Sequence, residues 1–194
     1  MEKSTRKNRD ILIALVLVGI VVVGAGSYFL SRHFFEKYLP YEDQMYGIKI
    51  SHPAGWSQAF EHKTIKENQV INLIAFRTPN AKPGDIGNFV NIIAYTVPQG
   101  LSLKDSMEQE LADMRIFYHG FQLVESSDTT LGGFSAHRFV YTFSQNGIEY
   151  KKLQIHVLKG PQGYALGYLQ EKKNYNWYMR QVEKMVKSFE FTKP

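Results

Sequence analysis

No cysteine occurs among the 194 residues of the chain. This absence excludes a disulfide framework, a thiolate metal site and a cysteine nucleophile. It also excludes a lipid-modified cysteine after the amino-terminal apolar run. Internal repeats and low-complexity tracts are absent as well, so neither feature divides the chain into separate parts.

Motifs of enzyme classes are lacking too. The stretch GFSAH at 133–137 differs from a nucleophile elbow because His137 replaces the last glycine. It also lies inside a predicted hairpin, where an elbow needs a strand-to-helix turn. Asp85 and Asn88 do not match the spacing of a calcium-binding loop. We therefore expect neither enzymatic activity nor a cofactor.

Charge is missing from residues 11–30, a run of 20 mostly apolar residues. About 20 such residues cross the hydrocarbon core of a bilayer, so we expect residues 11–31 to form a transmembrane helix retained as a signal anchor. The alternative is a cleaved signal peptide, with Val23 and Ala25 as the small residues before the cut. The length of the run favours the anchor, because a signal peptide needs a shorter one.

The flanks of this segment predict its orientation. Residues 1–10 carry four basic and two acidic side chains, and an excess of Lys and Arg favours a flank that stays in the cytoplasm. We expect a single-pass membrane protein with a cytoplasmic amino terminus and a domain on the extracytoplasmic or lumenal side. The whole chain has a net charge of +5, of which residues 1–37 account for +3. The rest is near neutral, so nucleic acid is not an expected partner.

Residues 32–44 are expected to be a tether, and residues 45–194 one domain of ordinary size. Two stretches within it, 70–77 and 89–97, are apolar at both odd and even positions. That pattern indicates strands of a sheet that is covered on both faces.

A second pair of strands, 135–145 and 148–158, flanks Asn146-Gly147. This dipeptide favours a two-residue hairpin turn, because both positions need a positive φ. Apolar side chains recur at helical spacing in residues 102–120 and 175–188, and Ser102 with Asp105 predicts a capped start for the first helix. Helices that follow runs of antiparallel strands indicate an α+β domain, here an α-β-α sandwich around a central antiparallel sheet.

This order of elements resembles the PsbP-like family. The resemblance rests on six stretches: YGIKISHPAGW (46–56), LSLKDSMEQEL (101–111), TLGGFSAHRFVYTF (130–143), NGIEYKKLQIHVL (146–158), GYALGY (163–168) and VEKMVKSFEF (182–191). It implies an α-β-α sandwich, a fold that also occurs in small eukaryotic proteins that bind the Ran GTPase. The family includes extrinsic subunits and assembly factors of photosystem II, which dock on membrane complexes. Some members are associated with calcium or manganese, but this sequence has no acidic cluster that supports such a role.

The first of these stretches raises the question of whether His52 binds or catalyses. Pro53 restricts its predecessor to an extended backbone and ends the strand, Gly55 permits the turn, and Trp56 supplies a large apolar side chain for the core. We interpret the stretch as a fold element, because an isolated imidazole lacks the partners that catalysis or metal binding requires.

His137 and His156 form the candidate metal pair. A two-residue turn at Asn146-Gly147 makes them cross-strand neighbours, and two imidazoles on adjacent strands suit zinc or copper. A stable site needs a third or fourth ligand, and the sequence provides none, so packing on the sheet is the favoured alternative. Glu108, Glu110 and Asp113 are expected on the solvated side of their helix.

Aromatic residues crowd the last third of the chain. Core packing accounts for most of them, and those left exposed mark a docking surface; the candidates are Tyr164, Tyr168, Tyr175 and Trp177. We expect a membrane-anchored, non-enzymatic protein-interaction module that assists the assembly or stability of a membrane complex through an unknown protein partner. The alternative is an exported protein that binds a metal or another small ligand.

Overall fold

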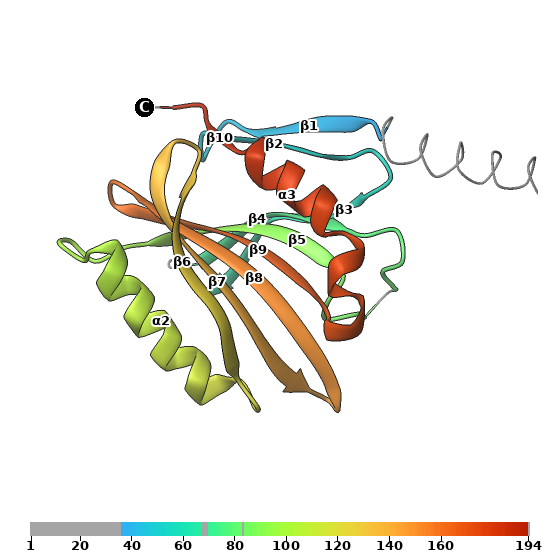
Figure 1. Ribbon diagram of the computed structural model, residues 1–194. Helices are drawn as coiled ribbons and strands as arrows, with labels where there is room; N and C mark the ends of the chain where they lie inside the picture. The colour runs from blue at the N-terminus through green and yellow to red at the C-terminus, as the bar shows by residue number, and fades with distance from the viewer. Residues whose placement is uncertain (1–35, 67–69, 83, 194) are drawn as a thin grey trace, which may run out of the picture. The chain divides into compact units, whose positions relative to one another are not determined.

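The computed structural model describes residues 36–66, 70–82 and 84–193 (Figure 1). Residues from Tyr38 to the carboxy terminus form one compact unit. The predicted transmembrane segment 11–31 lies outside the described residues. Within the part that is described, no helix has the length and apolar character needed to span a bilayer.

A seven-stranded antiparallel sheet forms the centre of this unit. Its strands, in spatial order, are β3 (Ser57–Lys66), β4 (Val70–Arg77), β5 (Phe89–Thr96), β9 (Gln162–Glu171), β8 (Ile148–Lys159), β7 (Phe134–Gln145) and β6 (Gln122–Leu131). The predicted hairpins β4–β5 and β7–β8 are confirmed. Asn146 and Gly147 have φ values of 53° and 77°, as the tight turn between β7 and β8 requires.

One face of the sheet is covered by α2 (Leu103–Phe117), as Figure 1 shows. The hydroxyl oxygen of Ser102 caps this helix by accepting a hydrogen bond of 3.1 Å from the backbone N–H of Asp105. The buried side chains Met107 and Met114 attach the helix to the sheet. The capped start of this helix was predicted correctly.

The opposite face carries the larger part of the core. It is covered by η1 (Lys172–Trp177), by α3 (Met179–Lys187) and by a second sheet of three strands, β1 (Tyr38–Asp43), β2 (Ile48–Pro53) and β10 (Glu190–Phe191). The expected α+β architecture with helices on both sides is confirmed, with this small sheet as an additional part of one layer.

The segment around His52 is a fold element, as interpreted. Trp56 is buried and meets the ring of Tyr178 edge-on, with 5.6 Å between centroids. His52 is buried as well, and its ring stacks on Phe76 at 4.4 Å. Burial lowers the pKa of His52, although its Nδ1 lies 3.0 Å from the carbonyl oxygen of Pro53.

Two boundaries differ from the expectation. Residues 32–44 were expected to be a tether, but β1 pairs with β2 and makes residues 38–43 part of the domain. The last helix was expected from residue 175, but a 3₁₀ turn occupies 172–177 and the α-helix begins at Met179. The strands β3 and β6 were not predicted, because neither has a clear alternation of apolar residues.

Candidate functional site

A cleft of about 610 Å³ lies between α2 and the strands β6 and β7. Its walls are apolar where the helix meets the sheet, with Leu103, Met107 and Leu111 from α2 and Ala136 and Phe139 from β7. Polar side chains line the part nearer to β6, namely Ser126, Asp128 and His137, and Lys104 and Glu108 lie on the helix side. The cleft therefore combines an apolar wall with a small polar group.

The position of β6 at the end of the sheet determines how these polar residues are presented. Leu131 faces Phe134 across Gly132-Gly133, whose φ values are both positive, so this turn is also a two-residue hairpin. In such a hairpin the closing pair exchanges hydrogen bonds and every second pair does the same. Asp128, which pairs with His137, therefore turns its N–H and C=O groups towards the open edge of the sheet.

His137 is the centre of the polar group. Its Nδ1 lies 2.8 Å from Oδ1 of Asp128, and its Nε2 lies 2.8 Å from Oγ of Ser126. The ring also meets Phe139 edge-on at 4.8 Å. These contacts occupy both ring nitrogens of His137 with side chains from the neighbouring strand.

His156 lies directly opposite His137, as the turn at Asn146-Gly147 predicted. Its Nδ1 lies 3.3 Å from the hydroxyl of Tyr95, and its buried Nε2 has no hydrogen-bond partner among the residues that the structure describes. Burial lowers the pKa of His156 to about 3, and the nearby charges of Lys152 and His137 act in the same direction. The imidazole is therefore neutral in ordinary buffers.

The two imidazoles do not form a metal centre by themselves. In the described part of the chain, no group of three or more His, Asp or Glu side chains is placed to hold a metal ion. A third ligand is the usual requirement of a zinc or copper site. The absence of a metal role stays a prediction.

A second polar cluster lies beneath α2. The hydroxyl of Tyr141 donates to Oε1 of Gln154 at 2.9 Å, and Nε2 of Gln154 lies 3.4 Å from Oε1 of Glu110. Burial raises the pKa of Glu110, while the charge of Lys152 opposes this shift. The expectation that Glu110 lies on the solvated side of the helix was wrong, because its carboxylate lies towards the sheet, 3.4 Å from the amide of Gln154. Glu108 and Asp113 are exposed, as expected.

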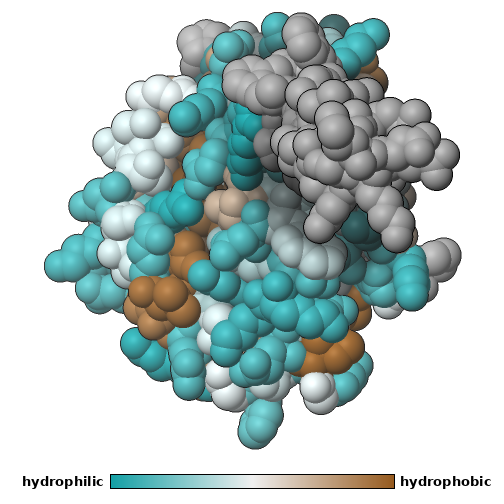
Figure 2. Space-filling model, turned by 45° about the vertical axis from the view of Figure 1, so that its right-hand side comes forward, coloured by the Kyte–Doolittle hydropathy of each residue, from teal (hydrophilic) through white to brown (hydrophobic). Residues whose placement is uncertain are grey.

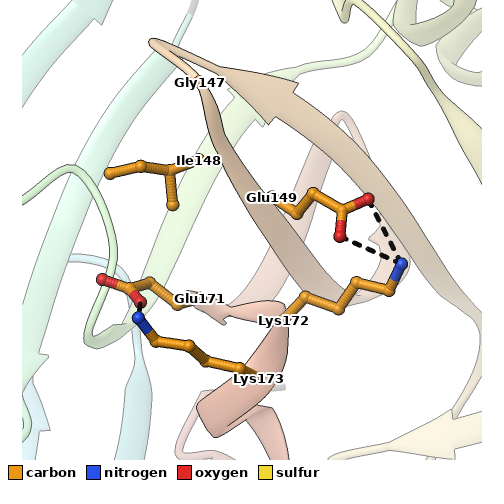
Figure 3. A pocket seen from close by; sticks show the side chains of 6 residues that line it. All are labelled: Gly147, Ile148, Glu149, Glu171, Lys172 and Lys173. Atoms are coloured by element: carbon orange, nitrogen blue, oxygen red, sulfur yellow. Dashed lines mark hydrogen bonds and ion pairs between the residues drawn. The ribbon is translucent and has the colours of Figure 1, made fainter.

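Another hollow, of about 540 Å³, lies between the β7–β8 turn and η1 (Figure 3). Lys172 pairs with Glu149 at 3.3 Å, and Lys173 pairs with Glu171 at 2.7 Å. Figure 3 shows both lysines turned towards their carboxylates. Since each charge has a partner of opposite sign, this hollow offers little to attract a charged ligand.

The four aromatic candidates for a docking surface do not lie together on the surface. Tyr164, Tyr168 and Tyr175 are buried, whereas Trp177 is 63% exposed. The hydroxyl of Tyr168 donates to the carbonyl oxygen of Tyr175 at 2.9 Å, which satisfies it inside the core. The three tyrosines are thus core residues, and only Trp177 is placed to meet a partner.

Exposed apolar side chains lie instead around the connection from α2 to β6. Ile116 and Phe117 at the end of the helix are 78% and 79% exposed, and Leu123 and Val124 at the start of the strand are 38% and 56% exposed. We call these four residues the α2–β6 patch. On the face drawn in Figure 2, hydrophobic residues form small patches separated by hydrophilic ones.

Sequence reasoning missed Ser126 and Asp128. A two-residue turn determines which residues face each other in a hairpin, as Asn146-Gly147 does for β7 and β8. The same rule applied to Gly132-Gly133 places Asp128 opposite His137. That glycine pair was the available signal.

No family model matches the chain, and no curated protein matches it in sequence. Solved structures do match its fold. The cyanobacterial PsbP protein (CyanoP) of Synechocystis sp. PCC 6803 is 13% identical, with a TM-score of 0.58 over 80% of this chain and 93% of that one. LpqN of Mycobacterium tuberculosis, which is involved in cell envelope biogenesis, is 16% identical, with a TM-score of 0.57 over 84% and 94%.

The Ran-binding protein Mog1p of Saccharomyces cerevisiae is 8% identical, with a TM-score of 0.50 over 81% of this chain and 96% of that one. At such identities the similarity concerns the fold, and the domain has the PsbP/Mog1-like fold. The architecture implied by the sequence resemblance is confirmed to that extent.

Proposed function

We propose that this chain is a protein-interaction module, anchored in a membrane by residues 11–31, with its domain on the extracytoplasmic side. The observation that carries the interaction role is the open edge of β6. This strand is the last of seven in the sheet and pairs only with β7 among the described residues. Most of its side chains are exposed.

An open strand edge selects its partner by backbone hydrogen bonds. The N–H and C=O groups of Ser126, Asp128 and Thr130 point away from β7, because these residues alternate with those that bond to it. An extended segment of another protein satisfies such groups by adding a further strand, and its alternate side chains give specificity. The occupant of this edge is therefore an extended peptide segment of a protein partner.

The α2–β6 patch supplies apolar contacts beside this edge. Ile116, Phe117 and Val124 are each more than half exposed, which is costly for a surface that meets only water. Large apolar side chains in a partner's segment would bury them. Among proteins of the same fold, one binds Ran and another acts in cell envelope biogenesis, and docking on a membrane complex fits this general mode.

Photo-crosslinking tests this function. A photoreactive amino acid replaces Val124 in the full chain, and crosslinks are formed in native membranes and identified by mass spectrometry. We expect one reproducible protein species from Val124 and none from the matched position Met45, which is 73% exposed in the turn between β1 and β2. Equal and diffuse labelling from both positions would contradict the proposal.

The anchor is tested separately by the amino-terminal mass of the protein extracted from membranes. An intact amino terminus is expected, because the apolar run exceeds what a signal peptide needs. A mature chain that begins near Gly26 would contradict the anchor and leave the interaction role unaffected.

A further inference from the structure

Ser126, His137 and Asp128 are connected in the order that activates a serine. A hydroxyl becomes a nucleophile when a neighbouring imidazole accepts its proton through one ring nitrogen and a carboxylate orients the other. Here Oγ of Ser126 lies 2.8 Å from Nε2 of His137, and Nδ1 of the same ring lies 2.8 Å from Oδ1 of Asp128. Both distances are those of hydrogen bonds.

The fold holds these three groups on one hairpin. Asp128 and His137 form a pair across β6 and β7, and Ser126 lies two residues before Asp128 on the same face. Cross-strand pairs without backbone hydrogen bonds bring their side chains closest together. The edge of His137 rests against Phe139, whose side chain is fully buried, and this contact limits rotation of the imidazole.

A hydrogen-bond donor for a developing oxyanion comes from the strand edge. The backbone N–H group of Ser126 points away from β7 and meets no other strand in the described part of the sheet. A donor of this kind stabilises the negative oxygen that forms when a hydroxyl attacks a carbonyl carbon. A docked peptide segment would bond to the same group, so the ester and the segment exclude each other at this position.

The cleft beside these groups is suited to an acyl chain. Leu103, Met107 and Leu111 of α2 face Phe139 of β7 across a space of about 610 Å³. Such a wall buries a short hydrocarbon chain. The substrate class that fits both features is a carboxylic ester with a short apolar acyl group.

We propose that Ser126 is the nucleophile of an ester hydrolase site, with His137 as general base and Asp128 as the residue that orients it. The Ser126 oxygen attacks the carbonyl carbon while Nε2 of His137 takes its proton. The ester C–O bond then breaks, and the departing alcohol receives that proton. A water molecule, deprotonated by the same nitrogen, releases the acid and restores Ser126, so that ester and water become acid and alcohol.

This activity goes beyond the proposed interaction role and differs from the expectation that no enzyme motif is present. The three residues come from two strands joined by a glycine turn, an arrangement that no linear hydrolase motif describes. Asp128 is 95% exposed, so water weakens its effect on the imidazole. We therefore expect a slow enzyme in which Asp128→Asn reduces the rate less than a change at Ser126 or His137.

The test uses the purified full chain, a fluorophosphonate probe and p-nitrophenyl butyrate. The probe should add to Ser126, as located by tandem mass spectrometry, because its phosphorus accepts the serine oxygen and releases fluoride. Ser126→Ala should abolish both labelling and hydrolysis, and His137→Gln should reduce both by about 100-fold, within the usual range for loss of a general base.

The matched control is Ser127→Ala, because Ser127 is the next residue of the same strand and its hydroxyl donates to Glu125 at 3.1 Å. This variant should react like the unchanged chain. A chain that is not labelled at Ser126, or a Ser126→Ala variant that hydrolyses the ester at the original rate, would overturn the assignment. Crosslinking through Val124 is independent of Ser126, so the two proposals fail separately.

Discussion

His137 and His156 face each other directly across β7 and β8, but their surroundings are opposite in character. The side chain of His137 is 19% exposed and has polar partners at both nitrogens, whereas His156 is 1% exposed and one of its nitrogens has no partner among the described residues. The two residues therefore differ in what they do: His137 belongs to a surface cleft, and His156 to the packed interior.

The burial of His156 predicts acid sensitivity. Its pKa is about 3 in the folded chain and about 6.5 when exposed, so the unfolded state binds more protons between these values. The stability contributed by the neutral ring is complete above about pH 6.5 and is lost as the pH falls towards 3. Besides Lys152 and His137, the polar group facing the ring is the Tyr95 hydroxyl.

We expect the free energy of unfolding to fall by roughly 2–3 kcal/mol more between pH 7 and pH 4.5 in the unchanged chain than in His156→Gln, since one pKa unit corresponds to about 1.4 kcal/mol. Urea unfolding at both pH values provides the measurement. Equal losses in the two proteins would show that His156 is not the buried group responsible.

Trp56 and His52 should contribute unequally to stability. Trp56→Ala should cost about 3–5 kcal/mol, because a buried indole leaves a large cavity. His52→Ala should cost less, about 1–2 kcal/mol, for a smaller ring that stacks on Phe76. The burial of His52 is what makes the loss of its ring costly. Equilibrium unfolding of both variants gives the ranking, and a reversed order would refute it.

Gly163 should not tolerate a side chain. A Cβ at this position would lie 2.2 Å from the ring of Tyr95, whereas a Cβ at Gly55 would meet nothing within 4 Å. Gly163→Ala should therefore lower the melting temperature by several degrees, on the order of 2 kcal/mol or more. The matched change Gly55→Ala should be neutral or slightly stabilising. Similar melting temperatures for the two variants would mean that Tyr95 moves aside freely.

Zinc and copper should leave the domain unaffected. The nitrogens of His137 already contact Ser126 and Asp128, and His156 is buried. We expect chelator and added metal to leave the melting temperature unchanged, because a ligand stabilises only in proportion to its binding. Stoichiometric micromolar binding in calorimetry, lost in the double variant His137→Ala and His156→Ala, would restore the ligand-binding alternative.

The parts of the fold that could be predicted were those with a strong local sequence pattern. Asn146-Gly147 predicted its hairpin and the pairing of His137 with His156, and the apolar stretch 70–77 predicted a sheet covered on both faces. β6 was missed because an edge strand exposed at most positions has no apolar alternation. Without that strand, Ser126 and Asp128 could not be placed beside His137.

Hydrogen-bond partners supplied by other elements could not be predicted from the sequence either. Glu110 lies towards the sheet because Gln154, 44 residues later, offers it a partner. Tyr168 is buried because its hydroxyl finds a backbone carbonyl inside the core. Residue type alone predicted a solvated acid in the first case and a surface aromatic in the second, since residue type does not reveal either hydrogen-bond partner.

The open edge of β6 as the docking element is the central claim, and a proline there tests it most directly. Thr130 turns its N–H away from β7, whereas the N–H of Thr129 bonds to it according to the register. Thr130→Pro therefore removes a donor only from the edge, which an edge strand tolerates, and Thr129→Pro breaks the sheet itself.

The measurement is the yield of the crosslink through Val124 in native membranes, taken together with the melting temperature of each purified variant. We predict that Thr130→Pro loses the crosslink while its melting temperature stays within about 3 °C of the original, a shift that corresponds to less than about 1 kcal/mol. Thr129→Pro should lower both. A stable Thr130→Pro variant that still forms the same crosslink at full yield would contradict docking through the β6 edge.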